Sequence, residues 1–219
     1  MDLIKLKYLY KLKEAGVEYF DGFDYEENSS MPNELKELEN ICKKCSLCDL
    51  SKTRTNVVFG EGNPNAKIMF IGEGPGAQED ISGRPFVGRS GQLLTKHILN
   101  TLNMTREDIY IANIVKCRPP NNRVPTIQEA ITCKPYLIKQ IEIINPDILV
   151  CLGKTAFNYL MDMNYPITKV RGQIFKFKEK KVIPTFHPSF ILRNPKFEEE
   201  FKKDFLLIKS LLWKKYYHF

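Results

Sequence analysis

The 219-residue sequence lacks the long apolar segments that membrane proteins and secreted precursors carry. No run approaches the 18 consecutive apolar residues of a membrane-spanning helix. The opening residues, MDLIKLK, scatter lysines through their apolar run, and no small-residue cleavage site follows them. Such a start does not fit a secretory signal. We therefore expect an intracellular protein, of the cytoplasm or nucleoid, with no membrane partner.

The motifs of the common nucleotide-binding loops are also missing. The loop GEGPGAQED at 72–80 has glycines that let the backbone turn sharply and approach a ligand. It lacks the third glycine of the Rossmann pattern, carries Pro75 inside it, and has no G-K-[ST] of a P-loop. Its carboxylates, Glu73, Glu79 and Asp80, would repel phosphate. They suit activation of water or stabilisation of a developing cation.

Acidic residues are outnumbered, and this balance favours anionic partners. The chain has 33 basic and 26 acidic residues, a formal net charge of +7. A basic surplus of this kind favours binding to DNA or RNA. Hydrophobic residues make up 43%, as in ordinary globular proteins, and the length suits one sizeable α/β domain. Six cysteines in an intracellular chain indicate a metal site or catalysis sooner than disulfides.

Short apolar runs alternate with helical patterns from about Ala66 onward. The runs of strand length are 67–71, 108–115, 147–152 and 182–186, and the helical patterns between them are 91–102, 126–144 and 154–161. This alternation predicts βαβ units and a parallel sheet covered on both faces, closed by an amphipathic helix over 197–213. Residues 1–40 read as an N-terminal extension with a basic amphipathic stretch that favours a helix, and 41–219 as a single domain.

The spacing of the cysteines predicts a metal centre. Cys42, Cys45 and Cys48 form C-x2-C-x2-C, and Cys117 and Cys133 lie further along the chain. A C-x2-C pair can share one centre, and two distant cysteines would complete a tetrad. Spacing alone leaves open which of the first three is surplus and whether the centre is zinc or iron–sulfur. The sixth cysteine, Cys151, lies in an apolar run and is expected to be an ordinary buried thiol.

Polar and aromatic side chains follow the predicted strands, where open α/β sheets bind ligands. Asn113 closes one strand, and its amide can read the edge of a base. His187 follows the last strand. Phe86, in a glycine-rich loop, can stack on a base or anchor the core. Residues 190–193, three apolar side chains and an arginine, resemble a wedge that enters a base stack, or form an ordinary exposed turn.

Several ordered motifs together resemble the family 4 uracil-DNA glycosylases, the iron–sulfur type of archaea and thermophilic bacteria. The matching stretches are VVFGEGNPNAK, IGEGPGAQEDISGRPFVGRSGQLL, IYIANIVKCRPPNNRVPT, TKVRGQ and FHPSFILRN, between about Cys45 and Arg193. The resemblance implies a three-layer α/β/α fold with a central four-stranded parallel sheet. It also implies removal of uracil from DNA and a structural [4Fe–4S] cluster on Cys45, Cys48, Cys117 and Cys133, with Cys42 extra.

The resemblance also implies roles for individual residues. Glu73 and Gly74 would line the pocket, Glu79 would be a carboxylate important for activity, Phe86 would stack on the flipped uracil, Asn113 would read its edge, and His187 would lie near O2. Ser189, Leu192 and Arg193 would contact DNA. Relatives often carry aspartate or asparagine where Gly74 stands, so Glu73 and Glu79 both stay candidates for holding the attacking water.

The resulting hypothesis is a monofunctional glycosylase that hydrolyses the N-glycosidic bond of uracil and leaves an abasic site, since no lysine suggests Schiff-base chemistry. We expect a monomer acting on single- or double-stranded uracil-containing DNA, and no motif indicates a sliding-clamp contact. Two alternatives stay open. One is a glycosylase for hypoxanthine or other deaminated bases. The other is a non-catalytic nucleic-acid-binding protein with a metal module, which would leave the polar residues at the strand ends unexplained.

Overall fold

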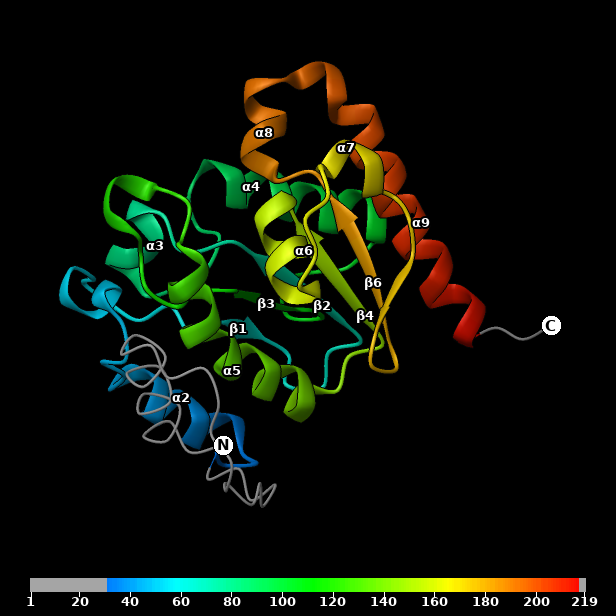
Figure 1. Cartoon of the computed structure of the whole chain (residues 1–219). Helices are drawn as coiled ribbons and strands as arrows, with labels where there is room; N and C mark the ends of the chain where they lie inside the picture. The colour runs from blue at the N-terminus through cyan, green and yellow to red at the C-terminus, as the bar shows by residue number, and fades with distance from the viewer. Residues whose placement is uncertain (1–30, 217–219) are drawn as a thin grey trace.

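The computed structural model describes residues 31–216 and contains one mixed sheet between two layers of helices (Figure 1). The sheet order is β1-β3-β2-β4-β6-β5. Its strands are β1 Glu61–Gly62, β2 Ile68–Gly72, β3 Tyr110–Asn113, β4 Ile148–Leu152, β5 Phe175–Phe177 and β6 Lys180–Thr185. The four central strands, β3, β2, β4 and β6, are parallel, so the predicted α/β class and four-stranded parallel sheet are confirmed.

Two edge strands extend the sheet beyond the prediction. β1 pairs with β3 and β5 pairs with β6, both antiparallel. With two and three residues they are too short to show a periodic apolar pattern. The parallel centre stays covered on both faces, as parallel sheets require, while the antiparallel strands lie at its edges.

The helices are α2 Leu35–Lys43, α3 Ala77–Ser82, α4 Arg89–His97, α5 Ile127–Ile144, α6 Lys154–Met161, α7 Ile167–Val170, α8 Pro188–Arg193 and α9 Glu198–Tyr216. A π-type turn, η2 Ile98–Leu102, continues α4, and 3-10 turns cover Asp49–Lys52, Pro120–Asn122 and Pro195–Phe197. The predicted helices over 91–102, 126–144, 154–161 and 197–213 are all present. None of the helices within 31–216 has the length and apolarity to cross a bilayer.

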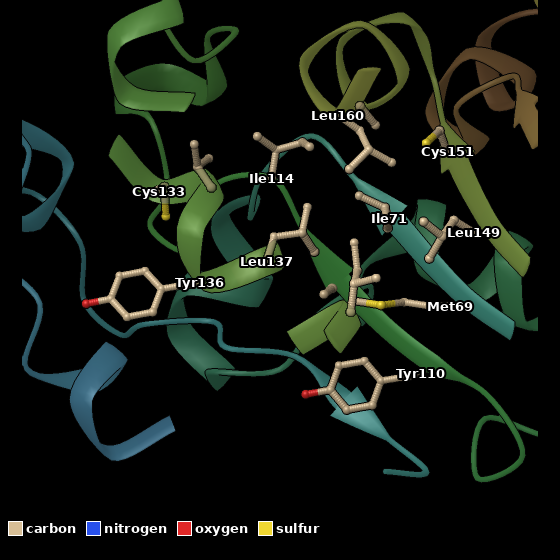
Figure 2. Close-up of a cluster of buried hydrophobic side chains, with 14 of the residues drawn as sticks. Met69, Ile71, Tyr110, Ile114, Cys133, Tyr136, Leu137, Leu149, Cys151 and Leu160 are labelled. Atoms are coloured by element: carbon tan, nitrogen blue, oxygen red, sulfur yellow. The ribbon is translucent and has the colours of Figure 1, made fainter. Parts of the chain in front are cut away.

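Alternating strand residues divide the core between the two faces of the sheet. On one face Met69, Ile71, Leu149 and Cys151 pack under α5 and α6, as Figure 2 shows. On the other face Phe70 and its alternating neighbours pack under α4, α8 and α9. Side chains of successive strand residues point to opposite faces, which produces this division. Cys151 is fully buried in β4, so its interpretation as a core thiol is confirmed.

Helix α2 joins the N-terminal cysteines to the rest of the molecule. It lies beside α5 (Figure 1) and buries Leu38 and Cys42 in the core on that face. It also runs across residue 40, where we expected the domain to begin. The amphipathic stretch expected over Leu3 to Leu12 lies outside the described residues.

Candidate active site

A cavity of about 630 Å³ opens at the carboxyl ends of the parallel strands. It collects eight of the nine base- and DNA-contacting residues named from the sequence: Glu73, Gly74, Glu79, Phe86, Asn113, His187, Ser189 and Arg193. The ninth, Leu192, does not line it. Figure 1 shows α8, which carries the last of these residues, directly after the end of β6. Strand-end placement therefore brings together side chains that lie more than a hundred residues apart in the chain.

The loop that carries Phe86 is fixed by charged groups on both sides. A Glu79 carboxylate oxygen accepts the backbone N–H groups of Val87 and Gly88, each at 2.9 Å. The guanidinium of Arg106 donates to the carbonyl of Phe86 at 3.1 Å and pairs with Glu61. Phe86 itself has a left-handed backbone, with φ of 52°, which a bulky residue adopts only when its surroundings hold it there.

Gly72 lets two candidate base-binding side chains come together. A Cβ at this position would lie 2.3 Å from the Asn113 Oδ1 atom and 2.7 Å from the ring of Phe86. The Asn113 side chain is 1% exposed, and its Oδ1 has no hydrogen-bond partner within the described part of the chain. A buried acceptor without a donor is costly, and Asn113 is one of the residues that line the cavity. It is therefore available to a ligand N–H.

His187 is held in one orientation by the start of α8. Its Nδ1 accepts the backbone N–H of Ser189 at 3.1 Å and lies 2.8 Å from the Ser189 hydroxyl. Because Nδ1 accepts, the proton of the neutral ring is on Nε2, the other nitrogen. Burial, with a smaller effect from Arg193, lowers the pKa of His187 to about 4. Its ring lies 5.8 Å from that of Phe86, so a neutral donor faces the same space as the aromatic ring.

The three carboxylates of the loop at 72–80 have different roles. Glu73 lines the cavity, and burial raises its pKa, while a hydrogen bond with Thr155 acts in the opposite direction. Glu79 binds the loop after Phe86. Asp80 accepts the backbone N–H groups of Thr55 and Asn56 and does not line the cavity. The expectation that Asp80 lies at the site with Glu73 and Glu79 is therefore wrong, because its side chain binds the backbone of the loop at 55–56 instead.

The predicted wedge at 190–193 is only partly available. Ile191 is 2% exposed and belongs to the core, and the ring of Phe190 stacks on Phe186 at 4.9 Å. Leu192 is 38% exposed, and Arg193 lies at the cavity. These residues belong to α8, whose 3.6-residue period turns Ile191 into the core, while Phe190 is partly buried and lines the cavity. A wedge made of all three apolar side chains is therefore wrong.

Sequence reasoning missed several residues of the site. Arg106 and Glu61 hold the Phe86 loop, and Thr155 bonds to Glu73. Arg106 lies in a segment without a distinctive motif, and Glu61 lies in the matching stretch VVFGEGNPNAK, for which no role of a single residue was expected. Lys154 adds positive charge to the cavity wall, whereas Arg123, which also lines it, is paired with Glu129. Position gave a signal for Lys154, because it directly follows the apolar run 147–152 that predicts a strand.

A second, smaller cavity collects five of the six cysteines. Its lining includes Cys42 from the last turn of α2, Cys45 and Cys48 from the loop after it, Cys117 after β3, and Cys133 in α5. All are free thiols. Arg54 donates to the sulfur of Cys117 at 3.2 Å, and the backbone N–H of Lys116 donates to that of Cys133 at 3.3 Å. Hydrogen bonds to cysteine sulfur are a common feature of iron–sulfur sites.

The donor set of this cavity fits a metal centre held by thiolates. Five thiols from three separate segments line it, and four thiolates can hold either zinc or an iron–sulfur cluster. Among the described residues no three His, Cys, Asp or Glu side chains stand close enough together to hold a single ion as they are placed.

Comparison with known proteins agrees with this arrangement. The family profile described as "Uracil DNA glycosylase superfamily" matches residues 59–207. A type-4 uracil-DNA glycosylase of Thermotoga maritima is 58% identical over 154 residues, which cover 69% of this chain and 80% of the relative. One of Archaeoglobus fulgidus is 43% identical, over 83% of this chain and 96% of the relative. One of Sulfurisphaera tokodaii is 48% identical, over 81% and 83%. The chain therefore belongs to the uracil-DNA glycosylase superfamily and, within it, to the type-4 uracil-DNA glycosylases.

Proposed function

We propose that this chain is a monofunctional uracil-DNA glycosylase of base-excision repair. It hydrolyses the bond between uracil and deoxyribose, releases free uracil and leaves an abasic site. The observation that carries this proposal is the buried Oδ1 of Asn113, which has no partner among residues 31–216. Asn113 shares one cavity with an aromatic ring and a neutral histidine donor. We assign the activity to residues 41–219, acting as a monomer on uracil-containing DNA inside the cell.

Base selection follows from the hydrogen-bonding pattern of Asn113. The enzyme flips the nucleotide out of the base stack. Unstacking and unpairing the base costs a few kcal/mol of free energy, and least when the base is mispaired. Phe86 stacks on the extruded base. The Oδ1 of Asn113 accepts the N3–H of uracil and its amide N–H donates to O4. Cytosine presents the opposite donor and acceptor at these positions, so it would leave buried polar groups unpaired and is rejected.

The chemical step uses His187 and Glu73. As the glycosidic bond lengthens, negative charge accumulates on uracil O2 and positive charge on the sugar. The Nε2–H of His187 donates to O2, and the ring needs no proton transfer to do so. Glu73 holds the attacking water or the sugar cation at the cavity wall. Glu79 serves as a positioning group, because one of its carboxylate oxygens, Oε1, accepts two backbone N–H groups of the Phe86 loop.

The DNA strand is held outside the cavity by basic and polar groups. Arg193, Ser189 and Leu192 belong to α8 and contact the backbone and the minor groove on the uracil side. Lys154 adds a phosphate contact at the same opening. Such contacts fix the register of the DNA and carry little sequence information. We therefore expect excision to depend on the base and to weaken with rising salt concentration.

The cofactor is a [4Fe–4S] cluster, held by Cys45, Cys48, Cys117 and Cys133. Bound there it supplies structural support, because hydrolysis of a glycosidic bond requires no electron transfer. It links the loop after α2, the end of β3 and α5. The loops after β3 also reach the base cavity, at Pro119, Asn122 and Arg123.

Activity is tested with an oligonucleotide containing a single uracil, followed by alkali to cut at abasic sites. Matched strands with thymine, cytosine or hypoxanthine in its place run in parallel. We expect cutting at uracil alone. Cutting at hypoxanthine instead would establish the second candidate specificity, and no cutting by folded, iron-containing protein would favour the binding-protein alternative.

The pH dependence of excision is expected to follow Glu73 and not His187. Burial raises the pKa of Glu73, so its ionised form is lost as the pH falls through a value above that of an ordinary glutamate. The pKa of His187, about 4, keeps the ring neutral over that range. We expect kcat/KM of the wild type to fall on acidification, and that of Glu73→Gln to be about 100-fold lower and nearly flat. If kcat/KM of Glu73→Gln fell on acidification as steeply as that of the wild type, the pH dependence would belong to another group.

Removal of Cys42 is expected to leave the cluster in place. Cys42 is 1% exposed and packs in the core with Leu38, so Cys42→Ala should cost about 1–2 kcal/mol of stability without loss of iron. Cys45→Ala and Cys48→Ala should each lose most of the iron. Iron and sulfide content of the purified variants measures this. If Cys48→Ala retained its iron and Cys42→Ala lost it, Cys42 would be the ligand and Cys48 the surplus cysteine.

A further inference from the structure

Lys116 is a buried cation without a carboxylate partner. Its side chain is 1% exposed and lies between the end of β3 and helix α5. The ammonium donates to the Gln140 Oε1 atom at 2.6 Å and to the carbonyl of Asn113 at 2.9 Å. Gln140 is fixed in this orientation, because its amide group donates to the carbonyl of Phe59. Both acceptors of the lysine are neutral, and among the described residues no acidic side chain forms an ion pair with it.

A buried ammonium of this kind needs a negative charge nearby. Taking a charge out of water costs several kcal/mol, and neutral acceptors return only part of it. The candidates for that charge are the thiols of Cys42, Cys117 and Cys133, and the backbone N–H of Lys116 donates to the Cys133 sulfur at 3.3 Å. All four side chains line the same small cavity. The compensating charge is therefore expected on the cysteine side of the lysine.

A nearby lysine shows the usual solution. Lys139, on α5 next to Gln140, has a side chain that is 11% exposed and lies 3.9 Å from a carboxylate oxygen of Glu142. It also bonds to Asn33. Of these two shielded lysines, only Lys116 has thiols in the place of a carboxylate.

We propose that Lys116 is the buried counter-ion of the iron–sulfur cluster and joins the cluster to the base-reading end of β3. The inference rests on the cofactor assignment above. Four thiolates and the cluster together carry net negative charge, which the ammonium offsets. Arg54, which bonds to the sulfur of Cys117, adds a second cation from the partly exposed side. Through the carbonyl of Asn113, the same ammonium connects the cluster to the residue that reads uracil.

The test compares Lys116→Met, Lys116→Arg and the control Lys139→Met with wild-type holoprotein. The readouts are iron content, the midpoint potential of the cluster and the rate of iron release to a chelator. Loss of the buried positive charge disfavours the reduced, more negative cluster, so Lys116→Met should have a lower potential. It should release iron about tenfold faster or more, since charge neutralisation within a buried site is worth more than about 1.4 kcal/mol. Lys116→Arg and Lys139→Met should behave as wild type.

Each outcome decides the question. A Lys116→Met protein that is empty of iron, beside a loaded Lys116→Arg protein, supports the counter-ion. A Lys116→Met protein with the wild-type potential and release rate overturns it. So does failure of both Lys116 variants to take up iron, because shape and not charge would then be decisive. Wild-type protein that contains no iron would refute the cofactor assignment and with it the counter-ion. Uracil excision, assayed on the same preparations, tests the proposed function separately.

Discussion

Asn113→Ala is expected to slow uracil excision by about 100-fold or more. The substitution removes both hydrogen bonds to the base, each worth about 1–3 kcal/mol in a site closed to water, and 1.4 kcal/mol corresponds to a tenfold change in rate. Its Oδ1 has no protein partner within the described residues, so the folded protein loses few contacts of its own. Single-turnover rates with an oligonucleotide containing one uracil measure the effect, and thermal unfolding checks the fold.

Asn158→Ala is the matched control for this prediction. Asn158 is also buried, at 6% exposed, but both ends of its amide are satisfied by the backbone of Tyr165, each at 3.1 Å. Its replacement should lower stability by about 1–3 kcal/mol and leave the rate of the folded protein nearly unchanged. A fall in rate that is equal in both variants would show that Asn113 acts through the fold, and the assignment of base reading to it would be wrong.

The parallel centre of the sheet was predictable because its residues are buried on both faces. Runs such as Ile68 to Ile71 and Ile148 to Leu152 are apolar throughout, and this continuous pattern is typical of parallel strands. Helix α5 begins where the sequence places Thr126 three residues before Glu129, and the two form reciprocal capping bonds. The edge strands were not predictable. Their pairing depends on neighbours distant in the chain, and their two or three residues carry no pattern.

The site was predictable where position and chemistry coincide. Asn113 and His187 were identified because a polar side chain directly after a buried strand has few structural reasons to be there. The contacts that fix their geometry were not. The bond from Ser189 to Nδ1 of His187 and the hold of Arg106 on the Phe86 loop depend on distances that only the folded chain defines. Asp80 shows the opposite error. It lies next to Glu79 in the sequence, which suggested a shared role, but on helix α3 its side chain binds the backbone of Thr55 and Asn56 instead.

Asp204→Ala is expected to have the largest effect on stability, a loss of about 3–5 kcal/mol. Asp204 is 3% exposed on α9. It accepts two N–H groups from Arg171, which follows α7, and the hydroxyl of Thr185 at the end of β6, at 2.6 Å. Gly172, with φ of +68°, leaves room for the carboxylate, since a Cβ there would lie 2.6 Å from it. The alanine would leave the partly buried guanidinium of Arg171 with the Glu200 carbonyl alone, and the buried hydroxyl of Thr185 without its acceptor.

The loss of stability in Asp204→Ala should come from the donors left without an acceptor and not from the strength of the ion pair. Burial raises the pKa of Asp204 in spite of Arg171, so desolvation opposes the attraction between the two charges. Asp204→Leu combined with Arg171→Met should therefore recover much of the stability that Asp204→Ala loses. Lys178→Ala, which breaks a solvent-exposed pair with Glu142, should change stability by less than about 0.5 kcal/mol. Urea unfolding of all four proteins gives these values. A double variant as unstable as Asp204→Ala would show that the ion pair itself stabilises the contact between α9 and β6.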